Sequence, residues 1–126
     1  MLDKRVIFCT TISNEEKNFN NFFKLIDKLK KIFNESYIIL IESDSTDNTN
    51  QLFENEMESR NGEIHSLGNL RNKFVKRSKR LEVCRNKYLS LINNNKFLRE
   101  FDYMIVLDAD NVNELLSPEV VNKSLV

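Results

Sequence analysis

The chain has 126 residues, of which 40% are hydrophobic, enough apolar side chains for one buried core and too few for two independent ones. Lysine plus arginine and aspartate plus glutamate both number 19, so the formal net charge is zero and a general attraction to nucleic acid or anionic membranes has no support. No apolar stretch has the length of a secretion signal or a membrane span. We therefore expect a single domain, residues 1–126, of a soluble, cytoplasmic protein that binds no nucleic acid and has no membrane span.

The few cysteine and histidine residues limit the available chemistry. Cys9 and Cys84 lie far apart in apolar surroundings without the spacing of a metal site, so buried thiols are expected instead of a disulfide. His65 is the only histidine, which excludes a metal site built from several histidines.

The first part of the chain predicts two strands with a helix between them. Residues 6–9 form a short apolar run, and residues 13–16 have the form of a capping box, so a helix is predicted to begin there. From residue 19 to residue 33, apolar side chains recur every three or four positions, which is typical of a helix that packs on a core. Residues 37–41 are unbroken and rich in β-branched side chains, as in a strand buried on both faces.

The alternation continues in the rest of the chain. A helix is predicted for residues 46–57, a weak strand for 62–67, a helix around 81–92, and for 103–107 a strand as apolar as that at 37–41. Strands that alternate with helices predict an α/β fold, with a mostly parallel, Rossmann-like sheet and helices on both of its faces.

Polar residues follow three of the four predicted strands, at residues 10–14, 42–47 and 108–110. In open α/β sheets, ligands bind beyond the carboxyl ends of the strands. We expect the three polar segments to converge on one crevice.

The last of these segments contains two aspartates, Asp108 and Asp110, on either side of Ala109. If the chain stays extended, both carboxylates point the same way while Ala109 turns aside. Mg²⁺ and Mn²⁺ accept oxygen ligands and are commonly held by one or two carboxylates plus the phosphates of a substrate. The alternative is a chance pair of acids in a solvated turn, but the position after an apolar strand favours the metal site.

Other charged residues fit a phosphorylated ligand. Glu42 and Asp44 follow the second strand, where carboxylates can accept hydrogen bonds from ribose hydroxyls or a base edge. Residues 71–80 carry six cations in ten positions. This segment is either a mobile, solvated loop or a phosphate-binding surface, and it leads into the helix that bears Arg85, whose guanidinium suits bidentate contact with a diphosphate.

Four sequence features resemble, in order, the donor-binding half of GT-A glycosyltransferases. They are "TTISNEEKNF" after the first strand, "IESDSTDNT" after the second, "RLEVCRN" on a helix, and "VLDAD" as an Asp-x-Asp motif. The matches span residues 5–110, and their order and spacing are more specific than any one of them. The "ES-S-D-T" form with the "R....RN" helix is most similar to the capsule-associated mannosyltransferase-like branch. Glu42 and Ser43 depart from the two aspartates that are usual in the superfamily.

The resemblance implies a metal-dependent transferase that takes a sugar from a nucleotide-diphosphate donor to a glycan or other hydroxyl acceptor. The implied donor-site residues are Thr10, Glu42, Asp44, Arg80, Arg85 and Asp108, and Mn²⁺ or Mg²⁺ would be held by Asp108 and Asp110. No catalytic base is identified. In such enzymes the acceptor site usually follows the Asp-x-Asp motif, and only sixteen residues follow Asp110. We therefore expect most of the acceptor-binding half to be missing from these 126 residues.

Two other functions compete with this interpretation. "VLDADNV" also fits the motif of haloacid-dehalogenase-like phosphatases, in which Asp108 would be the nucleophile and Asp110 a general acid and base. In that family the motif follows the first strand and further motifs lie downstream, which argues against it here. A non-catalytic nucleotide-binding domain is the second alternative, because a fold by itself does not establish activity.

Overall fold

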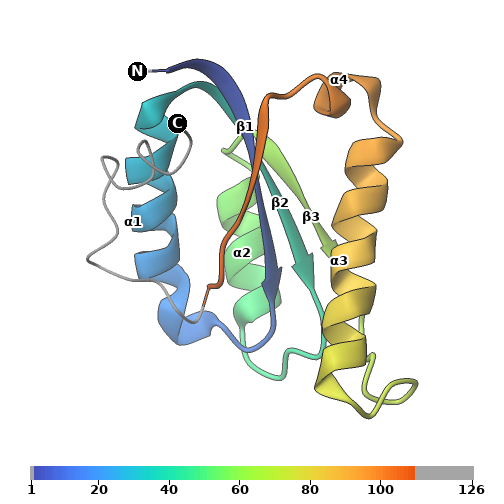
Figure 1. Cartoon of the computed structure of the whole chain (residues 1–126). Coiled ribbons are helices and arrows are strands. Elements are labelled where there is room, and N and C mark those ends of the chain that lie inside the picture. Colours follow the sequence, from blue (N-terminus) through green and yellow to red (C-terminus); the bar gives the residue numbers. More distant parts are fainter. Residues whose placement is uncertain (1, 110–126) are drawn as a thin grey trace.

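The computed structural model describes residues 2–109, which form a four-stranded parallel sheet with helices on both faces (Figure 1). The strands are β1 (Leu2–Ile12), β2 (Phe33–Glu42), β3 (Gly62–Ser66) and β4 (Tyr103–Val106), in the order β3-β2-β1-β4. The helices are α1 (Phe19–Leu29), α2 (Thr49–Met57), α3 (Arg77–Asn93) and α4 (Lys96–Arg99), with 3-10 turns η1 (Glu16–Asn18) and η2 (Lys30–Ile32). The predicted fold class is confirmed.

The core on one face of the sheet combines aliphatic side chains of β1, β2 and α1 with a cluster of aromatic side chains from α1 and α2. Phe53 of α2 is fully buried, and its ring lies 5.2, 6.0 and 5.5 Å from those of Phe19, Phe22 and Phe23. Such offset and edge-on pairs stabilise the packing beyond the area that they bury. The apolar spacing of residues 19–33 is thus explained by core packing, as predicted.

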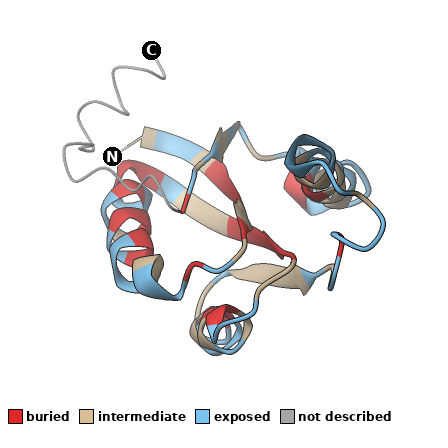
Figure 2. Ribbon diagram, turned by 90° about the horizontal axis from the view of Figure 1, so that it is seen from below, coloured by how far each residue is buried: buried red, intermediate tan, exposed pale blue. Residues whose placement is uncertain are grey.

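The opposite face is covered by α3 and α4. Figure 2 shows α1 and α2 on one side of the sheet and α3 on the other, with buried residues concentrated along the sheet and on the helix sides that meet it. Cys9, Cys84 and Tyr88 lie in this second core, and both cysteines are free, buried thiols as expected. Burial raises the pKa of the Cys9 thiol to about 12. None of the helices within residues 2–109 combines the length and hydrophobicity that crossing a bilayer requires.

β4 differs from the prediction of a strand like β2. It pairs with β1 at one edge of the described sheet, and only one of its faces is covered. Tyr103 and Ile105 pack on the α1 side, whereas Met104 and Val106 are 45% and 52% exposed, because α3 packs over β1 and β2 instead. A composition as apolar as that of β2 therefore did not indicate burial on both faces, since apolar composition does not distinguish an edge strand from a central one.

The predicted capping box is also wrong. Neither η1 nor α1 has a side-chain hydrogen bond at its N-cap, and η1 begins only at Glu16. Asn14 adopts a positive φ of 54°, and its Oδ1 accepts a hydrogen bond from the Thr46 amide at 2.7 Å. The Glu15 amide donates to Thr49 Oγ1 at 2.8 Å. These side chains join the loop after β1 to the loop after β2. Residues 46–48 belong to that second loop, and α2 begins at Thr49 and not at residue 46.

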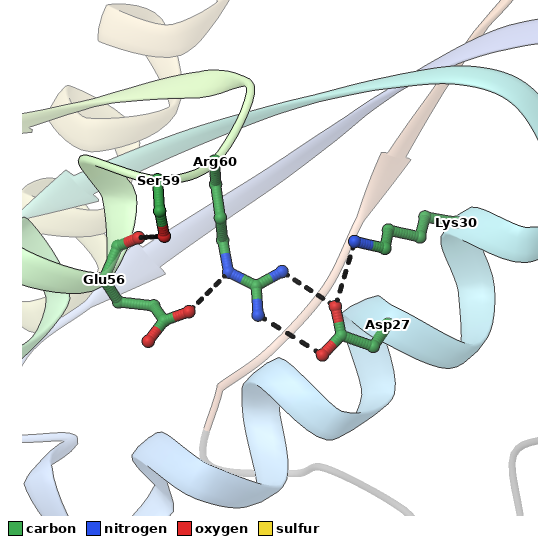
Figure 3. Close-up of polar contacts among 5 residues, drawn as sticks. All are labelled: Asp27, Lys30, Glu56, Ser59 and Arg60. Carbon is green, nitrogen blue, oxygen red and sulfur yellow. Dashed lines mark hydrogen bonds and ion pairs between the residues drawn. The ribbon is translucent and has the colours of Figure 1, made fainter.

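One arginine holds the ends of the two helices together on the α1–α2 face (Figure 3). Arg60 donates to Asp27 of α1 at 2.9 and 3.3 Å and to Glu56 of α2 at 2.8 Å, and its guanidinium lies 4.5 Å from the Phe23 ring centroid. Lys30 pairs with the same aspartate at 3.3 Å. The hydrogen bonds from Arg60 hold the pKa of the Asp27 carboxyl below its ordinary value, against the raising effect of burial.

We predict that Arg60→Ala lowers the free energy of unfolding by about 1 to 2 kcal/mol, because hydrogen bonds to a partly exposed carboxylate and one cation–π contact are lost. Chemical denaturation measures this difference. Because the pKa of the Asp27 carboxyl is lower in the folded protein, its ionised form stabilises the fold at pH values above the ordinary aspartate pKa. This stabilisation is lost as the pH falls through the pKa that the carboxyl has in the folded protein. The difference between the two proteins should therefore narrow in acid.

The matched control is Lys24→Ala, which removes an exposed cation from α1. Equal destabilisation by the two substitutions, or a difference that does not change with pH, would show that the Arg60 contacts contribute nothing specific.

Candidate functional site

A cavity of about 700 Å³ lies at the carboxyl ends of β1 and β4, beneath α3. The chain passes from β1 to β2 and β3 on one side and then returns to place β4 on the other side of β1. The strand order therefore reverses between β1 and β4, and such a switch point is where open α/β sheets bind ligands. The cavity brings together four predicted residues, Asp44, Arg80, Arg85 and Asp108.

Asp108 enters the cavity from the end of β4. Exposure alternates along β4 and beyond it, so Asp108 lies on the same side as Val106, which also lines the cavity, while Ala109 is buried in the α1-side core. The Leu107 amide donates to the Cys9 carbonyl at 3.0 Å, which extends the contact with β1. This matches the expected orientation of Asp108 and Ala109. The second aspartate of the motif, Asp110, lies outside the described residues.

Four arginines line the cavity, and the sequence predicted individual roles for only two of them. Arg80 and Arg85 were named, whereas Arg71 and Arg77 were noted only as part of a cationic segment. The sequence could have identified Arg77, because it lies three residues before Arg80 and this spacing places two side chains on the same face of a helix. The α3 residues of the wall are Arg77, Arg80, Leu81, Cys84, Arg85 and Tyr88. Within residues 2–109, neither Arg77 nor Arg85 forms an ion pair, so both heads remain open to a ligand.

Arg80 has a different environment. Its side chain is only 15% exposed, and it donates to the carbonyls of Phe74 and Val75 at 3.0 and 2.6 Å. Its Nε lies 4.0 Å from Asp44 Oδ2. Arg80 thus holds the loop before α3 in place. A nucleotide, which Arg80 was expected to contact, would have to compete with these protein partners for its guanidinium.

Asp44 joins the loops after β2 and β3. It adopts a positive φ of 59°, its amide donates to the Gly68 carbonyl at 2.9 Å, and its Oδ1 accepts from the Arg71 amide at 3.0 Å. Aspartate is among the few residue types that tolerate this backbone conformation. The Asp44 side chain is only 4% exposed. Its carboxylate therefore serves mainly to hold the cavity wall together and offers little surface to a ligand.

Two predicted residues lie beside the cavity and do not line it. Glu42 is buried, and its carboxylate accepts hydrogen bonds from the Ser45 amide and the Ser66 hydroxyl. It borders a second, smaller cavity of about 390 Å³, which shares Asp44 and Arg71 with the first. Thr10 is fully buried in β1, next to Thr11 of the cavity wall, and its hydroxyl has no hydrogen-bond partner within the described residues.

The donor set suits a cation that a ligand helps to hold. Among residues 2–109, no three side chains of histidine, cysteine, aspartate or glutamate lie close enough to hold a metal ion. Asp108 is an exposed carboxylate of the described chain that lines the cavity together with the arginines that form no ion pair, Arg77 and Arg85. One or two carboxylates plus substrate phosphates is the ligand set usual for Mg²⁺.

Comparisons with known proteins support the fold and do not identify the chain. No family model matches it, and no curated protein matches it. The crystal structure of S. aureus TarS 1-349 is similar over 96% of this chain and 31% of that chain, with a TM-score of 0.54 and 16% sequence identity. TarS is a glycosyltransferase, and this chain spans about a third of the solved length. At this identity the likeness concerns the fold alone, a parallel α/β sheet with helices on both faces.

Proposed function

We propose that this chain is the donor-binding domain of a glycosyltransferase and binds a nucleotide-diphosphate sugar in the cavity beneath α3. One observation carries the proposal. Asp108, at the end of β4, lines the same cavity as two arginines of α3 that form no ion pair within residues 2–109, and this cavity lies at the switch point of the sheet. A GT-A-like fold supports it independently.

The arginines suit the diphosphate of such a donor. Arg77 and Arg85 are exposed at the cavity, and planar guanidinium groups bind phosphate oxygens through two parallel hydrogen bonds. When the bond between the sugar and the diphosphate breaks, negative charge accumulates on the departing phosphate. Cationic groups fixed beside that oxygen stabilise the transition state more than the bound donor, which is what accelerates the reaction.

Asp108, together with Asp110 outside the described residues, would hold Mn²⁺ or Mg²⁺ against the diphosphate. Such an ion, when bound, supplies positive charge to the leaving group. Asp108 lines the same cavity as the arginines of α3, so this chain can approach the phosphates with a carboxylate-held cation and with arginines.

The sugar would pass to a hydroxyl group of a glycan or another acceptor. Donor position alone does not complete this reaction, because the acceptor must be oriented and its proton removed. Within the GT-A superfamily, the "ES-S-D-T" pattern that begins at Glu42 and the "R....RN" pattern that contains Arg85 favour the capsule-associated mannosyltransferase-like branch.

We predict that nucleoside diphosphates bind with metal dependence and that Asp108→Asn removes most of it. Calorimetry of nucleoside diphosphates and nucleotide sugars, with and without Mn²⁺, should show about tenfold tighter binding with metal for the unaltered chain, since one charged ligand contact is involved. Asp3→Asn, at the far end of β1, is the control and should keep this dependence.

Three results would contradict the proposal in different ways. Metal-independent binding that Asp108→Asn does not change would remove the metal site. Binding of nucleoside diphosphates without binding of nucleotide sugars would favour a nucleotide-binding domain that takes no sugar donor. Phosphate release from simple phosphomonoesters would favour the haloacid-dehalogenase-like alternative.

We also predict that Arg85→Ala weakens nucleoside diphosphate binding by a factor of about ten to a hundred, as expected for the loss of a charge-assisted hydrogen bond. The melting temperature should stay unchanged, because Arg85 is exposed on α3. Lys87→Ala removes a cation from the same helix without touching the cavity wall and should leave affinity unchanged. Equal affinities for Arg85→Ala and the unaltered chain would exclude Arg85 from the site.

A further inference from the structure

The segment between β3 and α3 forms an ordered loop with an apolar tip. In Figure 1 it lies at the end of the molecule to which the strand arrowheads point. Arg80 fixes the loop by donating to the carbonyls of Phe74 and Val75, and the Phe74 and Lys73 amides donate to the Leu70 carbonyl at 2.8 and 3.0 Å. The Phe74 side chain packs against the α3-side core, whereas Val75 is 88% exposed. The backbone therefore holds one apolar side chain out in solvent.

Cations surround this apolar tip. Arg71, Lys73, Lys76 and Arg77 are exposed, and none of them forms an ion pair within the described part of the chain. Lys79 is different, because Glu82 lies 3.4 Å from it. The zero net charge of the whole chain thus hides a local concentration of unpaired positive charge.

We propose that this surface, the cationic loop of Arg71, Lys73, Val75, Lys76 and Arg77, docks on an anionic lipid bilayer. Lysine and arginine near a membrane are attracted by anionic headgroups, and an apolar side chain among them can enter the boundary between headgroups and acyl chains. A soluble polyanion would account for the cations but would give Val75 no apolar environment. The exposed valine is what favours a bilayer over a polyanion.

Such docking is a peripheral contact and needs no spanning helix. It acts at short range, since the surface potential falls off within a Debye length of about 8 Å at physiological salt. Arg71 and Arg77 also line the main cavity, so docking places the mouth of the cavity near the headgroups. The proposal does not depend on what the cavity binds.

The test is flotation of the full chain with vesicles of phosphatidylcholine alone or mixed with phosphatidylserine. Binding is expected only to the mixed vesicles and should weaken as salt is added. Replacing both lysines (Lys73→Gln with Lys76→Gln) should weaken it about thirtyfold, and Val75→Ser about fivefold, since each contact acts near the surface. Neither change touches the cavity wall, and an unchanged melting temperature confirms that the variants fold.

The matched control replaces two exposed lysines of the α1 region, Lys28→Gln with Lys31→Gln, and should bind as the unaltered chain does. A heparin column run in parallel distinguishes the soluble polyanion. Retention on heparin, with vesicle binding that Val75→Ser leaves unchanged, would overturn the proposal in favour of a polyanion site. An equal loss of vesicle binding in the control pair would show that only the overall charge matters, which would overturn the proposed surface. Absence of binding to the mixed vesicles would overturn the proposal outright.

Discussion

The parallel pairing of β1 with both of its neighbours is the constraint on which the rest of this structure depends. Parallel strands end at the same edge of a sheet, so the segments that follow β1, β2 and β4 meet there whatever their separation in sequence. The apolar cores on the two faces keep β1 in the middle. Side chains then complete the edge, with Asn14 bound to Thr46 and Asp44 bound to Arg71.

Much of this arrangement follows from apolar spacing. The unbroken run at residues 37–41 is typical of a strand or of a buried helix segment, and its β-branched content favours the strand. The stripe of phenylalanines on α1 required a covered helix, and Asp108 could be placed at the sheet edge once the last strand was recognised. Composition and period are local properties, and these features depend on nothing else.

The remaining features depend on partners that are distant in sequence. Ser13 and Glu16 match a capping box, yet the backbone amides nearby bond to residues more than thirty positions away, such as Thr49. Asp44 and Glu42 were expected to face a ligand, but their carboxylates accept hydrogen bonds from loop amides and a hydroxyl that only tertiary structure brings near. Polar residues at the edge of a sheet indicate a binding site. The sequence does not show which of them hold the wall of the site together and which contact the ligand.

The distance along the chain between β1 and β4 has a consequence for how the cavity is made. The amide of Arg5 donates to Asp102 across a separation of 97 residues, whereas β1 and β2 are joined by a single short helix and its turns. Contacts this remote close late in folding because the loop entropy that they cost is recovered only when the intervening chain is already compact. During synthesis from the N-terminus, β1, β2 and β3 emerge long before β4. The nascent chain can therefore form three strands and an aromatic core while the ligand cavity still lacks the wall that carries Asp108.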